Sequence, residues 1–177
     1  GGHTEHYAHI APELAFEYRY LGDNAITEAY AFLFEHLVED PEWLRRRLGI
    51  EDAGSLLAHG RVARLIYMRR YAAKLLYELE FHSADDVTGM GPRYVEILAD
   101  ALKVEPSPVD YLGDIDAGFY VSCYLRSWAF EAQVQSHLRG EFGNAWFTRR
   151  EAGSLLRELW SEGQRMNADE IFPGKQR

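Results

Sequence analysis

Residues 23–37 read DNAITEAYAFLFEHL, and this stretch shows the pattern that decides the fold. Asp23 or Asn24 can cap a helix here, because short polar side chains accept hydrogen bonds from the first free backbone amides. Apolar residues then recur every three or four positions, as one helix face requires, at Ile26, Tyr30, Leu33 and Leu37. The stretch therefore predicts an amphipathic helix with one face in a core.

Similar helix signals lie on both sides of this stretch, and strand signals are nearly absent. Asp40 followed by Pro41, for example, predicts an N-cap with proline at the first helical position. The expected helices cover residues 3–9, 24–37, 41–48, 62–81, 91–102, 118–138 and 149–162. We find no repeat, low-complexity tract or linker. The sequence predicts an all-α protein with a single multi-helix domain.

Two of these helices carry more detailed predictions. The longest helix is expected to bury the apolar face formed by Leu65, Ala72, Leu76 and Leu79. Its opposite face is expected to be solvated and carries Arg64, Arg69, Arg70, Lys74 and Glu78. The last long helix is expected to start with a capping box between Thr148 and Glu151.

Composition narrows the classes of partner and compartment. The 177 residues are 47% hydrophobic and 14% aromatic, which suffices for a substantial core. A formal net charge of −9 repels phosphate backbones and anionic headgroups, so neither nucleic acid nor a membrane is an expected partner. The single cysteine, Cys123, cannot form an internal disulfide, and no leader pattern or spanning apolar run is present. We expect a cytoplasmic location.

The first residues, GGHTEHY, contain a candidate metal ligand. A Gly-Gly pair directly before His3 is what the end of an H-E-x-x-H zinc motif looks like without its first two residues. In that motif the two histidines share one helix face and bind one Zn²⁺, with the glutamate between them as general base. On this residue alone, an exposed histidine beside a vector-derived Gly1-Gly2 is the simpler interpretation.

Glu28 strengthens the metal interpretation. It follows His3 by 25 residues on the next expected helix, where a third zinc ligand is commonly a carboxylate. Its neighbours Ala29, Tyr30 and Phe32 are apolar, and an unpaired carboxylate in such surroundings is costly. The pair of His3 and Glu28 is thus better evidence for a site than either residue alone.

These residues resemble the thimet oligopeptidase and oligoendopeptidase F superfamily of zinc metallopeptidases, particularly its oligoendopeptidase F branch. His3 and His6 resemble the end of the H-E-x-G-H-x-x-H motif of that family, and Glu28 with Glu35 resembles its E-x-x-x-x-x-x-E helix. The resemblance runs in order over most of the chain, from His3 to about residue 170.

Two later segments extend the resemblance, and a third departs from it. Residues 70–82, RYAAKLLYELEFH, are similar to the R-Q-x-x-F-x-x-F-E helix of the family, and residues 119–124, FYVSCY, to its F-Y-V-Y-x-Y segment. The family usually has a histidine and then a tyrosine shortly before the latter segment. Residues 111–118, YLGDIDAG, contain no histidine.

The resemblance implies a function for the longer protein from which this chain would come. Residues 1–172 would be the C-terminal part of a zinc metalloendopeptidase catalytic domain, with residues 173–177 as a tail. Zinc would have three protein ligands: His3, Glu28 and a first histidine that this chain does not contain. Tyr120 or Tyr124 would donate a hydrogen bond to the oxyanion. Substrates would be short peptides. The chain by itself lacks the first His and the Glu of the motif, so we expect it to be inactive and to bind zinc weakly or not at all.

Several alternatives remain open at the level of sequence. Tyr120 and Tyr124 could belong to an aromatic core stripe with Trp128 rather than to a cleft. The chain could be a non-catalytic helical module that binds peptides or proteins on the same scaffold, or a plain helical interaction domain. The remaining histidines are expected at the surface or at helix ends, namely His9, His36, His59, His82 and His137.

Overall fold

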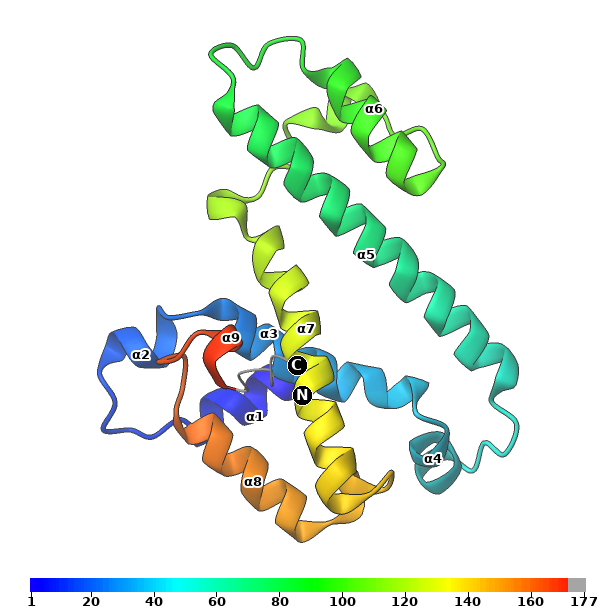
Figure 1. Cartoon of the computed structure of the whole chain (residues 1–177), viewed down its shortest axis with the longest axis vertical. Coiled ribbons are helices and arrows are strands. Elements are labelled where there is room, and N and C mark those ends of the chain that lie inside the picture. The colour runs from blue at the N-terminus through cyan, green and yellow to red at the C-terminus, as the bar shows by residue number, and fades with distance from the viewer. Residues whose placement is uncertain (172–177) are drawn as a thin grey trace, which may run out of the picture. The chain divides into compact units, whose positions relative to one another are not determined.

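The computed structural model of this chain describes residues 1–171, and all its regular elements in that range are helices (Figure 1). This confirms the predicted all-α class. The predicted tail, residues 173–177, lies outside the described residues. Contacts divide the chain into two compact units. Unit 1 contains residues 1–57 and the chain from residue 126 on, and unit 2 contains residues 58–125.

Unit 1 is built from both ends of the chain. Its elements are α1 (Gly2–His9), α2 (Phe16–Tyr20), α3 (Asn24–Glu35), η1 (His36–Glu39), α4 (Pro41–Trp43), the single π-helical turn η2 (Leu44–Leu48), most of α7 (Val121–Phe142), η5 (Trp146–Thr148), α8 (Arg150–Ser161) and α9 (Ala168–Ile171). α1 packs against both α3 and α8. The predicted face of α3 is buried, and the Tyr30 ring meets Phe130 of α7 and Trp160 of α8 edge-on.

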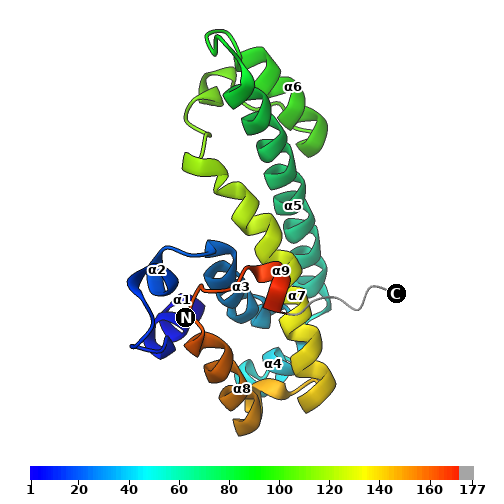
Figure 2. The ribbon, with the colours of Figure 1, turned by 60° about the vertical axis from the view of Figure 1, so that its left-hand side comes forward.

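Unit 2 has a core of its own. It contains α5 (Gly54–Ser83) from residue 58 on, α6 (Gly91–Leu102), η3 (Pro108–Tyr111), η4 (Ala117–Phe119) and the start of α7. α6 lies beside the C-terminal part of α5 (Figure 2). Ala73 and Tyr77 of α5 are buried against Tyr94 and Leu98 of α6. The Tyr77 hydroxyl also donates a hydrogen bond to the Tyr111 carbonyl at 3.1 Å.

The predicted buried face of the longest helix is wrong. Leu65, Leu76 and Leu79 are exposed, with Leu76 at 59%, whereas the buried residues are Ala73, Lys74, Tyr77 and Glu78. The charged residues Lys74 and Glu78 can be buried because both find partners in residues 114–116. Side-chain pairing, which apolar spacing does not reveal, therefore sets the buried face of α5.

Capping predictions hold for two helices and fail for a third. Asp23 accepts a hydrogen bond from Ala25 N at the start of α3, and Asp40 accepts one from Trp43 N at the start of α4. Thr148 does not cap α8, because the N-cap residue is Arg149 and no side chain caps this helix; the Thr148 hydroxyl donates to the Ala145 carbonyl instead. Among residues 1–171, no helix combines the length and the apolar character needed to cross a membrane.

Candidate metal site

The structure brings His3 of α1 and Glu28 of α3 together. His3 Nε2 lies 3.4 Å from Glu28 Oε2. The His3 side chain is 46% exposed and that of Glu28 only 12%, so the pair lies at the surface with the carboxylate turned inward. The packing of α1 against α3 positions both groups. This is the placement that the metal-ligand hypothesis requires.

A second contact fixes the orientation of the His3 ring. Its Nδ1 lies 2.9 Å from the hydroxyl oxygen of Thr27, which is buried. When Nδ1–H donates to this hydroxyl, the lone pair of Nε2 faces Glu28. Metal-binding histidines are commonly oriented in this way by a hydrogen bond from the other ring nitrogen.

Gly2 makes the close approach of α1 and α3 possible. It is buried, and a Cβ atom at this position would overlap the carbonyl of Tyr30 in α3. Only glycine therefore allows α1 to lie this close to α3 without a shift of the backbone. Gly2 thus belongs to the packing that places His3 beside Glu28.

The separation of the two candidate ligand atoms fits a metal. Charge-assisted N–H···O hydrogen bonds are shorter, at about 2.7–2.9 Å. Two ligand atoms at adjacent corners of a tetrahedral zinc site lie about 3.4 Å apart, given bonds of about 2.1 Å. His3 and Glu28 are 3.4 Å apart, and no third His, Cys, Asp or Glu joins them within the described part of the chain.

His6 is not part of this pair. It is fully buried, and its ring lies beside the backbone of Gly163 without a hydrogen bond of good geometry to any group in residues 1–171. Its ring instead contacts those of Tyr7 and Tyr30, with centroid distances of 5.3 and 5.1 Å. Burial lowers the pKa of His6 to about 4, so the ring is neutral at pH 7.

Tyr120 and Tyr124 lie in unit 2, whereas His3 and Glu28 lie in unit 1. Tyr120 precedes α7 rather than lying within it, because Gly118 and Phe119 have positive φ angles of 63° and 57°. The Tyr120 and Tyr124 rings meet edge-on at 5.3 Å, and Tyr124 stacks on Tyr71 at 5.2 Å. The two tyrosines thus belong to an aromatic cluster within unit 2, and their catalytic role stays a prediction.

The segment 111–118, where the resemblance expects a histidine, is anchored to α5 by ion pairs. Asp114 accepts hydrogen bonds from Arg70 Nη2 at 2.8 Å and from the Tyr94 hydroxyl at 3.0 Å. Lys74 Nζ lies 2.7 Å from Asp116 Oδ1. The predicted solvated face of α5 is therefore wrong for Arg70 and Lys74. Their spacing of four residues, with Glu78 four further on, was the available signal for a shared helix face.

His36 lies at a helix end, as predicted, because it is the C-cap of α3, but it is not at the surface. It is buried, its Nδ1 lies 3.3 Å from Glu131 Oε2, and its ring stacks on Phe32. Glu131 is buried as well. Nothing in the sequence marked this pair, because 95 positions separate the two residues.

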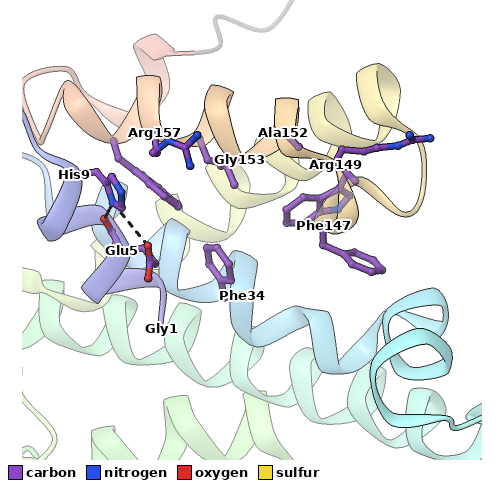
Figure 3. Close-up of a pocket in the computed structure, with 12 residues that line it drawn as sticks. Gly1, Glu5, His9, Phe34, Phe147, Arg149, Ala152, Gly153 and Arg157 are labelled. Carbon is purple, nitrogen blue, oxygen red and sulfur yellow. Dashed lines mark hydrogen bonds and ion pairs between the residues drawn. The ribbon is translucent and has the colours of Figure 1, made fainter.

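Unit 1 also contains a hollow of about 420 Å³ that the sequence did not indicate (Figure 3). Its walls come from α1, α3, η5 and α8, and its lining includes Glu5, His9, Phe34, Phe147, Arg149 and Arg157. His9 Nδ1 lies 2.8 Å from the Glu5 carbonyl at one side. Neither His3 nor Glu28 lines this hollow, so it is separate from the candidate metal site.

Comparison with known proteins adds no relative: no protein-family model, no curated protein and no solved structure matches this chain.

Proposed function

We propose that this chain is the C-terminal part of the catalytic domain of a zinc metalloendopeptidase that hydrolyses short peptides, and that His3 and Glu28 are two of its zinc ligands. The observation that carries the proposal is the 3.4 Å separation of His3 Nε2 and Glu28 Oε2, with Thr27 orienting the imidazole. The resemblance to oligoendopeptidase F supplies the reaction type and the substrate class.

The residues of this chain would hold the metal but not complete the reaction. His3 contributes an imidazole whose Nδ1 is held by Thr27, and Glu28 contributes a largely buried carboxylate. When bound, zinc would lower the pKa of a water and polarise the peptide carbonyl. The first histidine and the general base of the motif would precede Gly1. This chain alone would therefore be inactive.

The location of Gly2 supports this proposal. Gly2, directly before His3, is buried against the backbone of Tyr30, so it takes part in the fold. The motif interpretation requires a helix that continues through this position, and Glu5 N already donates to the Gly1 carbonyl at 3.0 Å.

One observation favours a second candidate function, a non-catalytic helical module that binds peptides or proteins. Asp114 and Asp116 are held by Arg70 and Lys74 in the segment where the resemblance expects a histidine that assists the oxyanion. Ion pairs of this kind fix the backbone of the segment and supply no oxyanion donor. A scaffold that has lost catalysis would look the same here.

Zinc titration by calorimetry tests the ligand assignment. We expect the chain to bind Zn²⁺ weakly, because two protein ligands are fewer than the three of catalytic sites. The chain extended by His-Glu before Gly1 completes the motif, and we expect it to bind at least about 100-fold more tightly. Glu28→Gln and His3→Ala should each abolish that gain. His9→Ala is the matched control on the same helix and should leave the gain intact.

Two results would contradict the ligand assignment. One is an extended chain that binds zinc no better than the original chain. The other is a gain in affinity that survives Glu28→Gln. Peptide cleavage by the extended chain would separate the enzyme from the non-catalytic module, provided that zinc binds as expected.

A further inference from the structure

Three exposed aromatic rings form a continuous row on unit 1, which we call the aromatic ladder: Tyr7, Tyr20 and Phe16. The Tyr7 and Tyr20 rings stack with their centroids 6.0 Å apart, and the Phe16 ring lies 5.2 Å from that of Tyr20. The residues are 37%, 40% and 61% exposed, in the order Tyr7, Tyr20, Phe16. Large aromatic rings that remain exposed side by side often mark a binding surface.

The helix that carries two of these rings is held firmly without a core of its own. α2 has no buried residue. It is fixed instead by hydrogen bonds to Gln164, whose backbone N–H donates to the Tyr18 carbonyl at 2.7 Å and whose Oε1 accepts from Gly22 N at 3.1 Å. Gln164 Nε2 also donates to the Tyr7 hydroxyl at 3.2 Å. The backbone and side chain of Gln164 together thus tie α2 to Tyr7 and pre-form the ladder.

The ladder begins one helical turn from the candidate metal pair. Tyr7 follows His3 by four residues on α1, so the two lie on the same helix face. On α3, Thr27 and Glu28 contact His3. Asn24, one turn earlier on α3, accepts a hydrogen bond from Gln164, which also contacts Tyr7. Both helices therefore place Tyr7 next to the metal pair.

Arg19 adds a positive charge without an acidic partner. Its guanidinium lies over the Tyr20 ring, 5.0 Å from the centroid, and its Nη2 donates to the Tyr20 hydroxyl at 2.9 Å. It is half-buried, its Nε is buried without a hydrogen-bond partner, and it makes no ion pair within the described residues. In a chain with 28 acidic residues, a half-buried arginine without a carboxylate is available for an anionic ligand.

We propose that the aromatic ladder and Arg19 bind the C-terminal aromatic residue of a short peptide, with the ring on the ladder and the carboxylate at Arg19. This inference rests on the proposed function, because it makes the ladder a substrate subsite beside His3 and Glu28. An aromatic ring and a carboxylate on one residue match this surface, because the Arg19 guanidinium lies 5.0 Å from the centroid of the Tyr20 ring.

Titration by NMR chemical shifts tests the ladder in the chain itself, without zinc. The probes are acetyl-Ala-Ala-Phe with a free carboxylate, the same peptide with a C-terminal amide, and acetyl-Ala-Ala-Ala with a free carboxylate. We expect the first to bind, with shifts at residues 7, 16 and 20. We expect the amide to bind about 3–5-fold more weakly and the alanine peptide about 5–10-fold more weakly.

Variants locate the binding surface. Tyr20→Ala and Phe16→Ala should each weaken binding of the phenylalanine peptide by about 3–10-fold, and Arg19→Gln should remove the difference between acid and amide. Tyr18→Ala is the matched control, since Tyr18 is an equally exposed aromatic residue of α2 outside the ladder. Circular dichroism checks that each variant is folded.

The outcomes separate this inference from the metal proposal. Equal affinity for the three peptides, or an effect of Tyr18→Ala as large as that of Tyr20→Ala, would overturn the inference. Binding that survives His3→Ala is the expected result, because the ladder does not require the metal. A ladder that fails while zinc binds to His3 and Glu28 would leave the proposed function standing.

Discussion

His6 is a neutral histidine in the interior of unit 1, and this makes it sensitive to acid. Its ring contacts those of Tyr7 and Tyr30, and among residues 1–171 the nearby Gly163 backbone makes no hydrogen bond of good geometry to it. The buried Tyr30 hydroxyl beside it also has no partner in that range, and burial raises the pKa of Tyr30. Protonation of His6 in the folded chain would place an unpaired charge in these surroundings.

We predict that stability falls as the pH is lowered from about 6.5 towards 4. The pKa of His6 is about 4 in the folded chain, below the value of 6.5 expected when it is unfolded. Between these values the unfolded state binds the extra proton, so acid favours unfolding. The loss between pH 7 and pH 5 should be about 2 kcal/mol from this residue, measured by urea unfolding.

His6→Leu keeps an apolar side chain at this position and should remove that part of the pH dependence. His9→Gln, at an exposed histidine of the same helix, should retain it. An unchanged pH dependence in His6→Leu would mean that other groups cause the acid loss.

At the scale of the elements, sequence predicted the existence of the long helices better than their faces. α3 follows from its own spacing and from Asp23, because its whole apolar face enters one core. The buried face of α5 does not follow from its own spacing, because the burial of Lys74 and Glu78 depends on Asp114 and Asp116, about 40 positions away. A local sequence pattern cannot predict the burial of a charged residue whose partner lies in a distant segment.

The candidate site likewise combines features that the sequence predicted with features that only the structure revealed. The spacing of His3 and Glu28 and the helices that carry them were visible in the sequence. Thr27, which orients the imidazole, was not recognised, because a threonine inside a helix usually has no such role. Arg19 was missed because only the fold shows that it has no acidic partner among residues 1–171.

Asp23 joins three helices, and we predict a large loss of stability when it is removed. Its carboxylate accepts hydrogen bonds from Ala25 N in α3, from both Nη atoms of Arg126 in α7 and from Ala168 N in α9. Asp23→Ala should lower the free energy of unfolding by about 3 kcal/mol or more, since it also leaves Arg126 without its main partner. Urea unfolding measures the effect.

Asp23→Asn provides the internal comparison. Asparagine caps helices well, so this variant should lose less stability than Asp23→Ala. Asp86→Ala is the control for a turn-forming aspartate at the surface, where Asp86 accepts hydrogen bonds from Thr88, and should cost less than about 1 kcal/mol. Equal losses for Asp23→Ala and Asp86→Ala would refute the three-helix role.

At the scale of the whole molecule, the two units have separate cores, although the sequence showed no linker. The boundaries at residues 57/58 and 125/126 fall inside α5 and α7. A continuous helix has neither the glycine and proline content nor the polarity by which linkers are recognised. Units that are joined through continuous helices therefore leave no boundary signal in the sequence.

We predict that each core can be weakened separately. Tyr77→Ala removes a fully buried ring from unit 2 and should destabilise that unit by about 3–5 kcal/mol. Hydrogen exchange of the α6 amides should accelerate by at least about 100-fold while that of α3 stays unchanged. Leu33→Ala in the core of unit 1 should give the reverse pattern. Uniform acceleration in both variants would show that the units unfold together.

Unit 1 is assembled from the first 57 residues and the chain beyond residue 125. We therefore expect it to stay assembled when the backbone between these two parts is cut. A protease that cut the turn between Ser83 and Gly91 would produce two polypeptides, each carrying one part of unit 1. Tyr30 would come from one piece, and Phe130 and Trp160 from the other. The nicked molecule should elute as one species in size-exclusion chromatography and separate only in denaturant. The two pieces, expressed separately, should restore the fold when they are mixed.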